Sequence, residues 1–209
     1  PRAVKKLFES RQAAYRNCHL ALDTENKSPA DAAREIAAWL LPEKKLAVNL
    51  GGVKRPLFIT PKADAVLADL CQGRRLALLT DQNLAGLHRE RLAQGLPRHA
   101  AITLPAGEKS KSLAGAGKVY AGLAGARLGR HDLLLALGGG MITDLGAFVA
   151  ATFKRGMDFV LLSTSLVGCV DAAIGGKAAV NLAEGKNLVG AFTRPNAVVL
   201  DLLALATLK

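Results

Sequence analysis

The chain has 209 residues, enough for one or two domains, and half of them are hydrophobic, so it can bury a substantial core. No apolar run reaches the ~18 residues that a membrane helix needs, and no N-terminal segment resembles a signal peptide. The net charge of +11 favours anionic ligands. Because its Lys and Arg residues are dispersed and not interleaved with aromatics, we expect a small phosphorylated molecule rather than a nucleic acid as partner.

The cysteine content indicates a reducing compartment. Cys18, Cys71 and Cys169 lie far apart and form neither a CxxC pair nor a metal-ligand spacing. An odd and sparse count of this kind is typical of cytoplasmic proteins. We therefore expect a cytoplasmic protein in which each cysteine is a small buried apolar residue rather than a nucleophile.

The first 42 residues predict a small unit of their own. Apolar residues at helical spacing predict a helix over residues 3–17, followed by a short strand at 19–22. Ser28 and Pro29 are typical of an N-cap and a first helical position, and the helix that they begin should end before Pro42. The charged stretch after Pro42 predicts a boundary between a domain of residues 1–42 and one of residues 46–209.

The second domain alternates strands and helices. Short apolar runs predict strands at residues 46–50, 56–60, 76–79, 101–104, 132–137 and 159–162. Helical patterns lie between them at residues 62–70, 83–94, 112–125 and 142–152. This order predicts an α/β fold with a Rossmann-like open parallel sheet and flanking helices. Ligands of such sheets bind at the carboxyl ends of the strands, which directs attention to the loops at 80–83, 105–111 and 138–144.

A run of three glycines, residues 138–140, follows the most apolar predicted strand. Glycines let the pyrophosphate of a dinucleotide approach the backbone amides, which would otherwise be shielded by side chains. The spacing is not GxGxxG, and a tight strand-to-helix turn explains the glycines equally well. Asp144, in the first helical turns beyond them, could bind a ribose hydroxyl or act only at the helix N-terminus.

Two further segments are rich in polar groups. The loop at residues 107–111 carries Glu108, which could accept from ribose hydroxyls, and Lys111, which could pair with a phosphate; it could also be a solvated helix start. Residues 163–190 place Lys177 after two glycines, and Lys186 beside Asn187. This density of Gly, Lys, Asn and Asp suits an oxygenated, anionic ligand, although a hairpin with polar turns would have a similar composition.

These motifs together resemble the N-terminal, NAD-binding part of 3-dehydroquinate synthases. The likeness is strongest over LGGGMITDLGAFVAATFKRG at residues 137–156 and over STSLVGCVDAAIGGKAAVNLAEGKNLVGAF at residues 163–192. It extends back to GEKSK at residues 107–111 and, more weakly, to TDQN at residues 80–83. The resemblance implies that NAD acts as a recycled cofactor while the phosphate of a seven-carbon sugar-acid phosphate (DAHP) is eliminated and the ring recloses as 3-dehydroquinate, in the shikimate pathway of aromatic amino acid biosynthesis.

The resemblance also implies a role for individual residues. It places the following residues at NAD: Asp81, Asn83, Glu108, Lys111, Gly139, Gly140, Asp144, Thr164, Ser165, Lys186 and Thr207. It places Asp171, Lys177 and Asn187 at the substrate. Arg155 would reach the substrate phosphate in the neighbouring subunit, which implies a homodimer. Thr143 stands where the family usually has glycine, and it would add a side chain near the pyrophosphate.

The family's divalent metal, zinc or cobalt, is held by one Glu and two His in a helical domain that would follow Lys209. The four histidines of this chain match none of those positions. We therefore expect no complete metal site within these residues and no turnover by the chain alone.

The N-terminal segment SRQAAYRNCHLALDT at residues 10–24 resembles the end of shikimate kinases, in which an Arg precedes a Tyr by four residues. Arg11 and Tyr15 have this spacing, and Arg11 would match the family's shikimate-binding Arg. A fusion of two shikimate-pathway enzymes would explain it; an unrelated helical extension is the alternative. For the second domain, the alternatives are another sugar-phosphate cyclase, a non-catalytic nucleotide-binding scaffold module, or an alcohol dehydrogenase of similar fold.

Overall fold

A computed structural model describes residues 27–28, 32, 36, 44–50, 52–87, 96–169 and 174–205. The chain divides into two units, Pro1–Trp39 and Leu40–Lys209, and the elements below belong to the second. The predicted helix at 3–17 and strand at 19–22 lie outside the described residues, as do Arg11, Tyr15, Cys18, Asp171 and Thr207. The two-domain division and the kinase-like segment therefore stay predictions.

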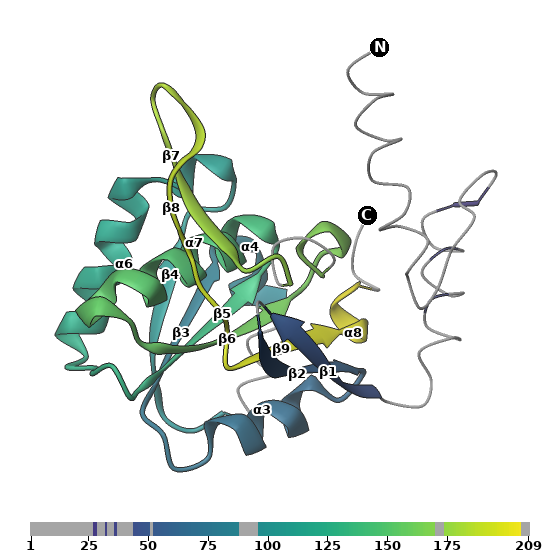
Figure 1. The fold of residues 1–209 in the computed structure, drawn as a ribbon. Coiled ribbons are helices and arrows are strands. Elements are labelled where there is room, and N and C mark those ends of the chain that lie inside the picture. The colour runs from purple at the N-terminus through teal and green to yellow at the C-terminus, as the bar shows by residue number, and fades with distance from the viewer. Residues whose placement is uncertain are drawn as a thin grey trace. The chain divides into compact units, whose positions relative to one another are not determined.

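A seven-stranded sheet forms the centre of the second unit, in the order β1-β2-β9-β6-β5-β3-β4 (Figure 1). Its strands have the following bounds: β1 Lys44–Leu50, β2 Val53–Thr60, β3 Leu76–Asp81, β4 His99–Leu104, β5 Leu133–Gly138, β6 Asp158–Ser163 and β9 Ala197–Asp201. All neighbours pair in parallel except β1 and β2, which form an antiparallel hairpin. The α/β fold is confirmed, with an antiparallel edge strand that the sequence did not predict.

Helices cover both faces of this sheet. They have the following bounds: α3 Ala63–Cys71, α4 Gln82–Leu87, α6 Leu113–Gly125, α7 Gly140–Thr152 and α8 Leu202–Leu205, with 3-10 turns η1 Glu108–Ser110 and η2 Phe153–Arg155. Leu67 of α3 packs with alternate strand residues such as Leu135 and Val160 on one face. On the other face, α7 lies so close that a Cβ on Gly146 would be 2.5 Å from the Cβ of Ala136. Burial on both faces explains why the central strands read as continuous apolar runs.

A second, two-stranded sheet stands apart from the first. Strands β7, Lys177–Leu182, and β8, Gly185–Phe192, form an antiparallel hairpin that projects beyond α7 (Figure 1). The backbone amide of Asn181 donates to the carbonyl oxygen of Lys111 at 2.9 Å, which ties the hairpin to the loop after β4. The polar stretch at 163–190 is thus in part the hairpin that its composition also allowed.

The cysteines that the structure describes fit the expectation of small buried residues. Cys71 and Cys169 are both free and buried. Burial raises the pKa of Cys71 to about 11, and burial likewise raises the pKa of Cys169. Both thiols therefore stay protonated at neutral pH and are poor nucleophiles. No helix within the described ranges is both long and apolar enough to cross a membrane.

Two glycines in neighbouring helices predict opposite effects of the same substitution. Gly146→Ala should lower the free energy of unfolding by about 1–3 kcal/mol, because its Cβ would lie 2.5 Å from Ala136. Gly117→Ala should raise it by about 0.5–1 kcal/mol, because this exposed position in α6 has no atom within 4 Å of the added Cβ. Urea denaturation measures both, and equal effects would contradict the packing of α7 on β5.

An ion pair at the amino edge of the sheet predicts a loss of stability in acid. The Nε of Arg75 donates to Asp132 at 3.1 Å, and the amide of Gly129 donates to the same carboxylate. The hydrogen bond from Arg75 is the main reason why the pKa of Asp132 lies below its usual value. A carboxyl group with a lowered pKa stabilises the fold above its unfolded pKa of about 3.9, and this contribution is lost as the pH falls through the folded pKa.

Asp132→Asn should therefore flatten the dependence of stability on pH below about 4. Urea denaturations between neutral and acidic pH would show this, and Arg75→Gln should reproduce most of the change. An unchanged slope in both variants would mean that this pair does not contribute to acid sensitivity.

Candidate nucleotide-binding site

The carboxyl edge of the sheet collects most of the predicted site. β3 ends at Asp81, β5 ends at Gly138, and β6 ends just before Thr164 and Ser165. After β3 the chain moves outward to β4, and it then returns to add β5 on the other side of β3. This reversal between β3 and β5 is the topological switch point, the place where open α/β sheets bind ligands.

The turn from β5 into α7 is a suitable anion site. Helix α7 has 13 residues and begins at Gly140, with Gly139 as its N-cap. The first amides of a helix lack intrahelical partners and carry its positive dipole end. A Cβ on Gly140 would have no atom of the described residues within 4 Å, so they leave open space beside the backbone at this position. A Cβ on Gly139 would lie 3.2 Å from the hydroxyl oxygen of Ser165, so the loop after β6 closes one side.

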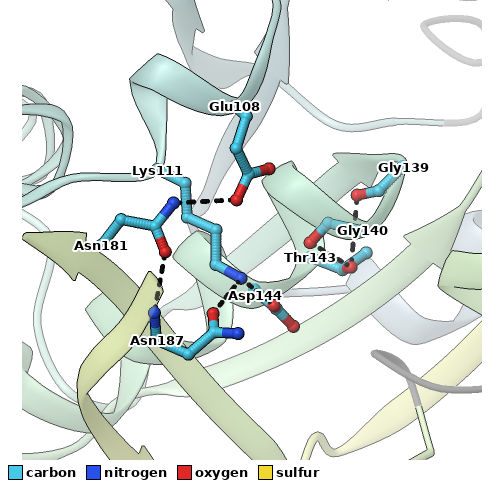
Figure 2. A network of polar contacts seen from close by, with 8 residues as sticks. All are labelled: Glu108, Lys111, Gly139, Gly140, Thr143, Asp144, Asn181 and Asn187. Atoms are coloured by element: carbon cyan, nitrogen blue, oxygen red, sulfur yellow. Dashed lines mark hydrogen bonds and ion pairs between the residues drawn. The ribbon is translucent and has the colours of Figure 1, made fainter. Parts of the chain in front are cut away.

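Thr143 does not enter this space. Its side chain is fully buried, and its Oγ1 lies 3.2 Å from the carbonyl oxygens of both Gly139 and Gly140 (Figure 2). The hydroxyl is thus turned back along its own helix. The Thr143 side chain therefore bonds to the preceding turn, and its effect on a pyrophosphate stays a prediction.

A polar network joins three separate segments beside the first turns of α7 (Figure 2). The Nζ of Lys111 forms an ion pair with Asp144 and donates to Oδ1 of Asn187 at 2.7 Å. Lys111 is only 5% exposed, so its charge is compensated almost entirely by these neighbours. Asn187 adopts a left-handed conformation with φ of 58°, which places its side chain toward the lysine.

Asn181 completes this network, and the family resemblance implied no role for it. Its side chain donates to Oε1 of Glu108 at 2.8 Å and accepts from the amide of Asn187 at 2.9 Å. It therefore connects the loop after β4 with both strands of the hairpin. Its place among the polar residues of 163–190 was the available signal, but spacing alone does not show which amide makes such contacts.

A cavity of about 630 Å³ lies beside the network, between the start of α6 and the β7–β8 hairpin. Glu108, Lys111 and Lys186, three of the predicted NAD residues, line it together with Asn181. Glu108, Lys111 and Lys186 thus line the same cavity, although up to 78 positions separate them in the chain.

Other predicted residues have different surroundings. Oδ1 of Asp81 accepts from the amides of Asn83 and Leu84, at 2.9 and 3.1 Å, so this carboxylate caps α4. Thr164 is buried, and Lys177 is exposed at the start of β7. Arg155 is exposed in η2, beyond the end of α7 that is opposite Gly140; the 13 residues of α7 span about 20 Å. Within the described ranges, no group of three or more His, Cys, Asp or Glu could hold a metal ion.

Comparison with known proteins gives the family. The family model for the N-terminal part of 3-dehydroquinate synthase matches residues 101–209, which include the glycine turn, the network and the hairpin. The chain belongs to the 3-dehydroquinate synthase family. It is 41% identical to the 3-dehydroquinate synthase of Azotobacter vinelandii over 169 residues, 78% of this chain and 46% of that protein. It is also 41% identical to that of Rhodospirillum rubrum over 189 residues, 87% of this chain and 49% of that protein.

A solved structure agrees with the 3-dehydroquinate synthase assignment. The 2-epi-5-epi-valiolone synthase of Streptomyces hygroscopicus, solved with NAD⁺ and Zn²⁺ bound, superposes with a TM-score of 0.71 at 29% identity. The match covers 78% of this chain and 47% of that protein. The chain thus spans about half the length of the 3-dehydroquinate synthases that it matches.

Proposed function

We propose that this chain is the NAD-binding half of a 3-dehydroquinate synthase. The observation that carries the proposal is the Lys111–Asp144–Asn187 network beside the start of α7. It sets a carboxylate, an amide and a buried cation next to a helix N-terminus whose first residue has open space beside it. This arrangement suits a dinucleotide, which requires amide donors for its pyrophosphate and carboxylate acceptors for its ribose hydroxyls.

The residues present fit NAD in detail. The α7 amides and Gly140 would hold the pyrophosphate, because a Cβ on Gly140 would meet no described atom within 4 Å. Glu108 and Asp144 would accept from ribose hydroxyls, with Asn181 and Lys111 fixing the two carboxylates in place. NAD, when bound, supplies reversible hydride acceptance. The chain's own contribution is to bind and orient the cofactor and to present Lys177 at the substrate side.

The described residues do not fit a divalent metal. The nearest polar network holds two carboxylates, each already bonded to a donor from Lys111 or Asn181. We therefore assign no reaction step of the described residues to a metal.

The activity is tested by measuring phosphate release from the seven-carbon sugar-acid phosphate, with NAD and Zn²⁺, by the complete product of the gene. We expect release that Lys177→Met abolishes, since its amine is the cation proposed for the substrate. A seven-carbon sugar phosphate without the carboxylate should not react. Turnover of that sugar phosphate, which lacks the carboxylate, and not of the sugar-acid phosphate would indicate another sugar-phosphate cyclase. If neither substrate reacts while a related enzyme is active in the same assay, the result would favour a non-catalytic nucleotide-binding module.

A further inference from the structure

A second cavity, of about 610 Å³, lies between the β1–β2 hairpin and the base of the β7–β8 hairpin. Three segments supply its polar wall: Asn49, Arg55, Gly175, Gly176, Thr193 and Arg194. The amide of Thr193 donates to the carbonyl oxygen of Gly176 at 3.0 Å, so two of these segments are fixed to each other. A backbone hydrogen bond therefore joins two of the segments that line the cavity.

This cavity is at the opposite edge of the sheet from the candidate nucleotide site. Strand β2 runs parallel to β9, with Leu57 paired to Val198 and Thr60 paired to Asp201 at the carboxyl edge. Arg55 precedes these pairs and lies about 17 Å along the strand from Thr60. An anion bound here would therefore not occupy the space at the start of α7.

The charges that line the cavity are of one sign. Arg55 and Arg194 both line it, and none of the described lining residues carries a carboxylate. The Nε of Arg55 is buried and has no hydrogen-bond partner among the residues that the structure describes. Arg74 and Arg75, at the same edge of the sheet, are instead paired with Asp158 and Asp132. Leaving a buried charged donor without an acceptor is unfavourable, so Arg55 favours an acceptor supplied by a bound ligand.

The remaining wall indicates the size and character of the ligand. Phe192, 88% exposed, and the side chains of Val53 and Ile174 add an apolar border. Oδ1 of Asn49 accepts from the amide of Gly52 at 2.8 Å, so the oxygen of this amide is engaged in the hairpin turn. We propose that the cavity binds the oxyanion group, phosphate or carboxylate, of a small organic molecule through the guanidinium groups of Arg55 and Arg194. Planar guanidinium groups bind such oxyanions with paired hydrogen bonds.

Calorimetric titration of the chain with inorganic phosphate, and separately with acetate, tests this proposal. Arg55→Gln and Arg194→Gln should each weaken binding of the preferred anion by about tenfold or more, as expected for the loss of a charged hydrogen-bonding group. Lys54→Gln is the matched control, because Lys54 is the exposed residue of β2 that directly precedes Arg55. This variant also removes one positive charge, and it should change the affinity for the anion by less than about twofold. Tighter phosphate binding would indicate a phosphate ester as ligand, and tighter acetate binding a carboxylate.

Lys111→Met separates this proposal from the proposed function. The arginine site predicts that anion binding survives this substitution in Lys111→Met protein that circular dichroism shows to be folded. Anion binding that is lost in Lys111→Met but kept in both arginine variants would place the anion at the nucleotide site and overturn the proposal. Equal weakening by Lys54→Gln would also overturn it, because general surface charge would then be sufficient. Arg194 is exposed, so its variant remains informative even where Arg55→Gln does not fold.

Discussion

Replacing Lys111 with methionine is expected to lower the free energy of unfolding by about 3 kcal/mol and to abolish measurable NAD binding. The lysine side chain is 6% exposed and that of its partner Asp144 is 21% exposed. Removing the cation leaves the carboxylate partly buried without its counter-charge, which is more damaging than losing the pair as a whole. It also removes the donor to Asn187 and thereby one of the ties that hold the β7–β8 hairpin against α7.

Lys109→Met is the control for this prediction, because Lys109 is an exposed lysine in the same loop. Its effect on stability should be within about 0.5 kcal/mol. The double variant Lys111→Met/Asp144→Asn should recover part of the lost stability, since no uncompensated charge remains. Urea denaturation gives the stabilities. Equal, small effects of Lys109→Met and Lys111→Met would show that the buried pair does not support the fold.

Gly140→Val is expected to reduce NAD affinity by about 100-fold or more while leaving the fold intact. The added Cβ meets no atom within 4 Å, so the chain itself does not resist it. The side chain would instead fill the space in which a pyrophosphate must approach the first amides of α7. Losing one or two charged hydrogen bonds accounts for a change of this size. Valine and glycine have similarly low helix propensity, so stability should change by less than about 1 kcal/mol.

Gly117→Val provides the matched control for the glycine turn. Gly117 is also helical and exposed, with no atom near an added Cβ, but it lies in the middle of α6. This variant should bind NAD as the unmodified chain does. Calorimetric titration measures the NAD affinity of both variants. Unchanged NAD affinity in Gly140→Val would mean that the dinucleotide does not contact the start of α7.

Much of the fold followed from local patterns in the sequence. The runs around Leu78, Leu135 and Val160 are apolar on both faces of the sheet, so they were recognisable as buried strands without knowledge of their neighbours. β9 and the antiparallel direction of β1 were not predicted. The pairing of β9 with β2 joins residues that are over 130 positions apart, and no local pattern encodes such a pairing.

The site was only partly predictable, for a related reason. Motifs placed Glu108, Lys111, Asp144 and Asn187 in one family pattern, but they did not show that Lys111 bonds to two of the other segments. Nor did they show Asn181 as the connecting residue or the inward rotation of Thr143. Those features depend on side-chain directions set by the packing of the hairpin on α7.

The most direct test of the central claim is calorimetric titration of NAD into this chain, with the double variant Glu108→Ala/Asp144→Ala beside it. These two carboxylates come from different segments and are the acceptors proposed for the ribose hydroxyls. We predict saturable binding by the unmodified chain that the folded double variant loses. Undiminished binding by the double variant, or no binding by a folded unmodified chain, would contradict the assignment of this edge of the sheet as the nucleotide site.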